Sequence, residues 1–533
     1  MSVKKTYWKG LSEKHQTPEF VDASVKEFQD DLPVDRFIAD EGVEQFKTGR
    51  RDFLKFMGFS IATATLASCE TPVIKSIPYV NKPEDITPGV ANWYTSSFYD
   101  GVDFANVLIK TREGRPIWLK GLKSGFTKGG MTSRIAASIL NLYNGERLNG
   151  PTYKNKEVSW EKADKKISSK LSSISKAGGS IRILSNTIVS PSTQKVIDSF
   201  SKNYGNNVKH IEYDAVSYCG IRNANKTCFG KSVLPSYHFD KAKTIVSINA
   251  DFITNWILPT KYSVDYGSRR KPENDWMSRH YHFESVLTLT GSNADYRGQI
   301  KPSQEGLTAL AILNELKGKE HNYPLSDKTL KLVKKAANDL KVNAGSSLVV
   351  AGSNNKDTQV LVNAINNHLG NYGQTIDMSC PLNLFNGNDA EVEQLSKDVI
   401  SGKVDALLIY GTNPVYSLPD GKAFGEALSR IKLSVSFSEF ADETASKCLF
   451  ICPDHNYLES WNDFSPVLGH YSLQQPMIRP LFNSRQAQES LMVWSGSASR
   501  DDKESISYHN LLKEQLASYG LDWNWSVHDG FIS

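Results

Sequence analysis

The sequence predicts a multidomain α/β protein that contains two doubly wound parallel-sheet modules. From residue 180 onward, short apolar runs of strand character alternate with amphipathic helical runs. This alternation restarts near residue 347, which indicates a second module of the same kind. The length of 533 residues, 39% of them hydrophobic and 10% aromatic, suits about three globular domains after an N-terminal leader.

The first module is predicted over residues 158–342. A helix over residues 160–174 follows Ser159, a good N-cap residue. Strands are expected at residues 180–184, 208–213 and 244–248, with helices at residues 192–204 and 218–229. A Lys- and Asn-rich stretch around residues 318–343 is expected to separate this module from the next.

The second module is predicted over residues 343–490. Its strands are expected at residues 347–351, 406–410, 433–437 and 447–452, and a helix at residues 358–368. A smaller β-rich domain is predicted over residues 70–157, with a hairpin of residues 104–110 and 115–119 followed by a helix over residues 132–143. Residues 491–533 are expected to begin a C-terminal segment of which the rest is missing.

Residues 1–69 are predicted to be an extended export leader. Arg50 and Arg51, followed by Phe53, Leu54 and Lys55, are typical of a twin-arginine signal. The uncharged residues 56–68 are too few to span a bilayer as a helix, which needs ~20 residues.

The uncharged stretch ends in small residues before Cys69, as in a bacterial lipoprotein signal. We therefore expect a lipid anchor at Cys69 on the periplasmic face of the cytoplasmic membrane, although residues 1–45 also fit an ordinary disordered tail.

Charge and cysteine content exclude several classes of protein. The net charge of +4 is small for this length and gives no indication of nucleic-acid binding. No segment after Cys69 is long and apolar enough to cross a membrane. The remaining cysteines are Cys219, Cys228, Cys380, Cys448 and Cys452, without a C-x-x-C pair. Cys448 and Cys452 have a spacing that zinc accepts, but their apolar surroundings favour buried strand cysteines.

Several segments resemble motifs of the molybdopterin oxidoreductase superfamily. They are residues 142–148, 160–163, 240–252, 366–373 and 409–414, so the resemblance covers nearly all of residues 100–490. Residues 458–463 and 469–478, with Arg485, are most similar to the large molybdopterin-like and iron–sulfur subunit of alternative complex III, a quinol oxidase. The resemblance implies partners in multihaem cytochrome c, integral membrane quinol-binding subunits and a ferredoxin-like iron–sulfur region.

The chain departs from the active members of that superfamily in its cysteines. Active members usually carry a four-cysteine motif for a 4Fe–4S cluster in the first domain, and here no cysteine lies between Cys69 and Cys219. Clusters are therefore expected only in a missing C-terminal region or in a separate subunit. Cys219 lies about where members of the family ligate molybdenum, but cysteines at helix starts are often simply buried, and we favour that interpretation.

Gly411, Thr412 and Asn413 follow a predicted buried strand, where open α/β sheets bind ligands. The same residues before Pro414 are also ordinary turn chemistry. We expect these three residues and Cys219 to be vestiges of a cofactor site, with no molybdopterin, metal or catalytic residue in this chain.

The expected function is thus a cofactor-free scaffold in a quinol-oxidising complex that passes electrons toward cytochrome c or a terminal oxidase. Two alternatives remain open. One is a working molybdenum subunit of the polysulfide or tetrathionate reductase type, and the other is a partner-binding lipoprotein with no respiratory role.

Overall fold

The computed structural model describes residues 89–319, 323–497 and 507–532, with four isolated positions before residue 22. The chain divides into two compact units, Met1–Pro88 and Gly89–Ser533. The export-signal residues and Cys69 lie outside the described residues, so their predicted roles stay predictions. Among the described residues, no helix combines the length and the apolar character that crossing a bilayer requires.

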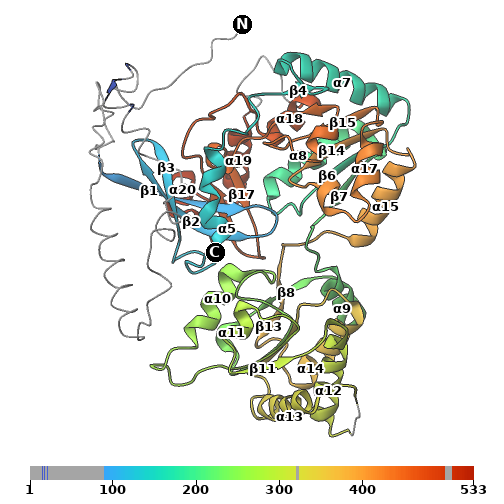
Figure 1. Cartoon of the computed structure of the whole chain (residues 1–533). Helices are drawn as coiled ribbons and strands as arrows, with labels where there is room; N and C mark the ends of the chain where they lie inside the picture. The colour runs from blue at the N-terminus through green and yellow to red at the C-terminus, as the bar shows by residue number, and fades with distance from the viewer. Residues whose placement is uncertain are drawn as a thin grey trace, which may run out of the picture. The chain divides into compact units, whose positions relative to one another are not determined.

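An antiparallel sheet of three strands opens the second unit (Figure 1). It consists of β1 (Ala91–Tyr99), β2 (Phe104–Arg112) and β3 (Arg115–Gly121), which confirms the predicted hairpin. The predicted helix over residues 132–143 is two short helices, α5 (Ser133–Ala137) and α6 (Ile139–Leu142). Their buried side chains pack with those of β2 in one core, which is why the sequence pattern looked continuous.

A seven-stranded sheet forms the largest element of the fold. Its order is β5-β4-β16-β15-β14-β6-β7, and the contacts β7–β6, β6–β14, β14–β15 and β15–β16 are parallel. The strands are β4 (Thr152–Tyr153), β5 (Lys156–Glu157), β6 (Ile181–Ser185), β7 (Val208–Glu212), β14 (Ala406–Tyr410), β15 (Leu433–Ser436) and β16 (Phe450–Ile451).

Helices cover both faces of this sheet, because alternate residues of β6 and β14 are apolar on opposite sides (Figure 1). One face carries α7 (Trp160–Lys176), α8 (Pro191–Tyr204), α18 (Ala487–Trp494) and α19 (Tyr508–Ser518). The other carries α15 (Asp389–Ile400) and α17 (Gly421–Leu428). The doubly wound arrangement is therefore confirmed, and the Ser159 Oγ cap on α7 is as predicted.

A four-stranded parallel sheet has the order β11-β10-β9-β12. Its strands are β9 (Thr244–Ile248), β10 (Arg279–Glu284), β11 (Tyr296–Gln299) and β12 (Ser347–Ala351). Helices α9 (Cys219–Phe229) and α10 (Pro259–Ser268) pack on one face, near the short α11 (Leu289–Ser292). On the other face lie α12 (Glu305–Lys317), α13 (Asp327–Val342) and α14 (Lys356–His368) (Figure 1).

The two sheets do not divide at the predicted boundary between residues 342 and 343. The chain leaves the seven-stranded sheet after β7, builds the four-stranded sheet including β12, and returns with β14. The stretch at residues 318–343, predicted as a separator, contains α13, which buries Val333, Ala336 and Leu340. Its lysines lie on the exposed face of that amphipathic helix, which made the stretch look like a linker.

Smaller elements complete the unit. Strands β8 (Leu234–Tyr237) and β13 (Ile376–Leu382) pair antiparallel. Strands β17 (Asn462–Phe464), β18 (Tyr471–Gln474) and β19 (Phe531–Ile532) form the last sheet, next to α20 (Trp523–Asp529). The described residues after 490 thus pack on earlier segments through α19 and β19 and are not a separate domain.

Candidate functional site

A cavity of about 640 Å³ lies at the carboxyl edge of the seven-stranded sheet. The residues that follow β6, β14 and β15 line it, together with residues from β1, α5 and the segment 454–464. After β6 the chain enters α8 on one face of the sheet, and after β14 it enters α17 on the opposite face. The cavity therefore lies at a topological switch point, where open parallel sheets bind ligands.

Gly411, Thr412 and Asn413 line this cavity, in the place that the sequence predicted. Gly411 has a φ of 64°, and a Cβ atom there would lie 2.8 Å from Asn186 Oδ1. Asn413 Nδ2 donates to Glu443 Oε2 at 2.7 Å, and Asn413 Oδ1 accepts from Thr444 Oγ1 at 2.6 Å. The polar groups of Asn413 thus fix its own loop, which is the turn role that the sequence also allowed.

Cys219 lies elsewhere. It begins α9, is 7% exposed, and its Sγ accepts a hydrogen bond from Asn223 Nδ2 at 3.2 Å. Cys219 is not part of the cavity lining, so the structure does not bring it together with the loop at Gly411. The described residues contain no group of three or more His, Cys, Asp and Glu side chains placed to hold a metal ion.

Cys448 and Cys452 are buried, as predicted, but they flank the short strand β16 and do not lie in a strand. Burial raises the pKa of both thiols well above the usual value, so each stays protonated. A protonated, enclosed thiol is a poor metal ligand and a poor nucleophile.

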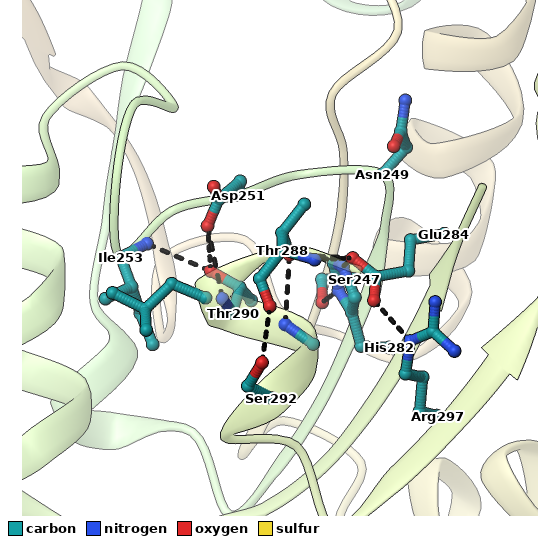
Figure 2. Close-up of polar contacts among 12 residues, drawn as sticks. Ser247, Asn249, Asp251, Ile253, His282, Glu284, Thr288, Thr290, Ser292 and Arg297 are labelled. Atoms are coloured by element: carbon teal, nitrogen blue, oxygen red, sulfur yellow. Dashed lines mark hydrogen bonds and ion pairs between the residues drawn. The ribbon is translucent and has the colours of Figure 1, made fainter. Parts of the chain in front are cut away.

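Sequence reasoning missed a buried polar network at the carboxyl edge of the four-stranded sheet (Figure 2). Ser247 Oγ and His282 Nδ1 are hydrogen-bonded, and His282 Nε2 lies 3.0 Å from Glu284 Oε2. Glu284 also accepts from Thr288 Oγ1 at 2.7 Å and pairs with Arg297 Nε. No motif spacing reveals this set, because its members come from β9, β10, β11 and the start of α11.

The network is closed and internally satisfied. Ser247, His282 and Glu284 have no exposed surface, so no substrate reaches this Ser–His–Glu arrangement. Burial lowers the pKa of His282, which keeps the imidazole neutral. Burial alone would raise the pKa of Glu284, but the hydrogen bonds from Arg297 and Thr288 lower it overall. A charged Glu284 therefore holds the strand ends in place.

No family model matches the chain. In an alignment 541 positions long, gaps included, the chain is 24% identical to the menaquinone reductase, molybdopterin-binding-like subunit of Nitratidesulfovibrio vulgaris, and this alignment covers 89% of the chain and 75% of that relative. Among solved structures it is similar to acetylene hydratase from Pelobacter acetylenicus, with a TM-score of 0.63 and 12% identity, over 82% of this chain and 74% of that one.

The chain has the fold of the molybdopterin oxidoreductase superfamily. The predicted fold class and the predicted resemblance at this level are confirmed.

The side chains around the cavity do not suit the phosphate groups of a molybdopterin nucleotide. Among the described residues, its lining includes the carboxylates of Asp100, Glu439, Asp442 and Asp454 and only one Lys or Arg, Arg134. Arg134 itself lies 3.4 Å from Asp103 Oδ2. Phosphate groups are bound best by surplus positive charge, which these lining side chains do not supply.

Burial raises the pKa of two of these carboxyl groups to about 7 or 8, so neither is fully charged at neutral pH. Burial raises the pKa of Glu439 to about 7, although Arg147 Nε lies 3.0 Å from its Oε2. Burial also raises the pKa of Asp454 to about 8, and the neighbouring Glu439 adds to the shift. Burial lowers the pKa of His455 to about 4, so this residue supplies no positive charge. The fold of this superfamily thus surrounds a cavity whose described side chains supply little positive charge for a phosphate-bearing ligand.

Proposed function

We propose that this chain is a scaffold subunit, not itself catalytic, of a quinol-oxidising respiratory complex like alternative complex III. One observation carries the proposal: the relative that aligns with 89% of the chain is named as a subunit of a menaquinone reductase and as molybdopterin-binding-like. A link to quinone chemistry is common to that name and to the resemblance in residues 458–478. The relative's name concerns reduction of the quinone, so the direction of electron transfer in our proposal depends on the resemblance alone.

The side chains support a structural role in such a complex. The cavity at the switch point lacks the positive charge that a phosphate-bearing pterin needs. The sequence has no cysteine between Cys69 and Cys219, where a cluster motif of active enzymes would stand. On this proposal the electrons pass through partner subunits: multihaem cytochrome c, an iron–sulfur ferredoxin-like region and quinol-binding membrane subunits.

The proposal includes export through the twin-arginine signal and a lipid anchor at Cys69 on the periplasmic face of the membrane. Several acyl chains at one cysteine would hold the subunit stably, because one chain alone binds a bilayer only marginally. Cell fractionation of Cys69→Ala tests this part. The variant should be exported and found free of membranes, and normal acylation of the variant would exclude this anchor.

Purification in mild detergent tests the proposal as a whole. The chain should co-purify with haem c subunits and with quinol-binding membrane subunits, and the complex should oxidise a quinol analogue. A chain that purifies from membranes without haem or membrane subunits would contradict the respiratory role. A complex that only reduces quinone would correct the direction of electron transfer and leave the scaffold role standing.

A further inference from the structure

A second cavity, of about 430 Å³, lies beside the edge strand β11 and the start of α13. Three cationic side chains are among the residues that line it: Arg297 from β11, Lys301 from the loop after β11, and Lys328 from the first turn of α13. Its other polar lining includes Gln304, Ser326 and Thr329, and none of the described lining residues is an Asp or a Glu. The charged side chains that line this cavity are thus cationic, whereas most of those that line the cavity at the switch point are Asp or Glu.

Arg297 is held in position by the buried network of Figure 2. Its Nε pairs with Glu284, whose carboxylate is fixed by Thr288 and His282. Gly291 allows this close packing, because a Cβ atom there would lie 2.0 Å from Glu284 Oε1. The side chain of Arg297 is 33% exposed, while that of Glu284 is fully buried. The guanidinium is therefore anchored on its inner side and leaves its two terminal nitrogens for another acceptor.

The two lysines form no ion pair with any described residue, although the carboxylate of Asp327 lies in the same first turn of α13 as Lys328. In the described part of the chain, neither the Lys301 nor the Lys328 ammonium pairs with a carboxylate. Ser326 Oγ caps the N–H of Thr329 at 3.2 Å, so the N–H groups of Asp327 and Lys328 remain at the start of this 16-residue helix. The positive end of the α13 dipole adds to the field of the three side chains, and the Asp327 carboxylate in the first turn offsets part of it.

We propose that this cavity binds a phosphate group, either of a small free phosphate ester or of an anionic phospholipid headgroup. Arg and Lys side chains together with the amides at a helix start are the donors that phosphate oxygens accept. The cavity volume lies within the range of small-molecule sites, so it holds the phosphate together with a substituent.

Titration of the full chain carrying Cys69→Ala tests the proposal without an acyl anchor. Inorganic phosphate is titrated at constant ionic strength against chloride, and vesicles of phosphatidylcholine with phosphatidylglycerol are compared with phosphatidylcholine alone. The double variant Lys301→Gln/Lys328→Gln should weaken binding about tenfold or more, since each lost charged hydrogen bond is worth more than 1 kcal/mol. The matched control Lys331→Gln/Lys334→Gln removes the same charge from exposed positions of α13 outside the cavity and should bind like the parent.

Binding of inorganic phosphate that depends on Lys301 and Lys328 supports the site and identifies a free phosphate as the ligand. Binding only to anionic vesicles, with the same dependence, supports it and identifies the lipid headgroup. The absence of both in the parent, or an equal loss in the two double variants, overturns the proposal, because the effect would then be diffuse electrostatics or nothing.

Discussion

The carboxyl edges of the two parallel sheets differ in structure: one is open and the other is closed. The carboxyl edge of the seven-stranded sheet opens into a cavity of about 640 Å³, and carboxylate side chains are among the residues that line it. The loop at Asn413 beside the cavity is held by its own hydrogen bonds. The edge of the four-stranded sheet is closed by Ser247, His282, Glu284 and Arg297, which satisfy one another (Figure 2). Parallel strands therefore end at a cavity on one sheet and at a closed polar network on the other, and the side chains at the strand ends make the difference.

Disruption of the clamp formed by Ser247, His282, Glu284 and Arg297 should cause the largest loss in the free energy of unfolding. Glu284→Gln leaves Arg297 and the Thr288 N–H without their buried acceptor charge, and we expect a loss of about 3 kcal/mol in the free energy of unfolding. Denaturant unfolding measures it. The control is Arg279→Gln, whose pair with Asp339 is 55% exposed on the arginine side and should cost below about 1 kcal/mol. Equal losses in the two variants would mean that the network is not a clamp.

The loop at the open edge is the next target. Gly411→Ala combines a left-handed φ of 64° with a Cβ contact of 2.8 Å to Asn186. This variant should lower the free energy of unfolding by about 2 kcal/mol. Gly402 has a φ of 74° with nothing within 4 Å, so Gly402→Ala isolates the backbone strain and should cost about 1 kcal/mol. Thermal unfolding of both variants gives the difference, and its absence would show that Asn186 moves away freely.

The strands could be predicted from the sequence because their signal is local. The runs at residues 244–248, 347–351 and 406–410 coincide with β9, β12 and β14, since each is a short apolar run between turn residues. Which strands pair could not be predicted, because β12 joins β9 and β14 joins β6 across long stretches of chain. For that reason the predicted boundary between residues 342 and 343 was wrong: it does not divide one sheet from the other.

The candidate sites were predictable to the same extent. The loop at Gly411 was found because it follows a strand of a parallel sheet, and the edge position is a property of topology. The buried network and the cavity beside β11 were missed, because each gathers single residues such as Ser247, Arg297 and Lys328 from separate elements. Cys219 was named from its distance along the family pattern, and the structure gives it a separate, buried place at α9.

The open edge should also respond to pH. Because burial raises the pKa of Asp454 from 3.8 to about 8, the native state binds a proton that the unfolded state releases, and stability falls as the pH rises through this range. Asp454→Asn removes the titration, so relative to the parent it should gain more than about 1 kcal/mol between pH 5 and pH 9. The neighbouring carboxyl groups of Glu439 and Glu489, which also raise the pKa of Asp454, are unchanged in this variant.

Denaturant unfolding at both pH values measures this gain. Asp405→Asn on the same sheet is the control: hydrogen bonding to Lys432 lowers the pKa of Asp405, which places its titration below this window. Its difference from the parent should stay constant between the two pH values. A constant difference for Asp454→Asn as well would contradict a buried proton at the cavity.

Cys219→Ser should have the smallest effect. The side chain contacts Asn223 and lies outside the cavity, so we expect a change of no more than about 1 kcal/mol in stability and unchanged quinol oxidation by the assembled complex. A metal ligand would behave differently, since each ~1.36 kcal/mol of lost transition-state stabilisation is tenfold in rate. A fall of about a hundredfold in turnover, with haem content intact, would assign Cys219 to an active centre.

The molybdenum and tungsten content of the purified complex tests the central claim most directly. Among the described residues that line the switch-point cavity, only Arg134 is a Lys or Arg, which does not suit a phosphate-bearing pterin. Elemental analysis should therefore find far less than one atom of either metal per chain while quinol oxidation persists. A content close to one atom per chain, together with release of a pterin on denaturation, would show that this chain is a working molybdopterin enzyme and would contradict the scaffold assignment.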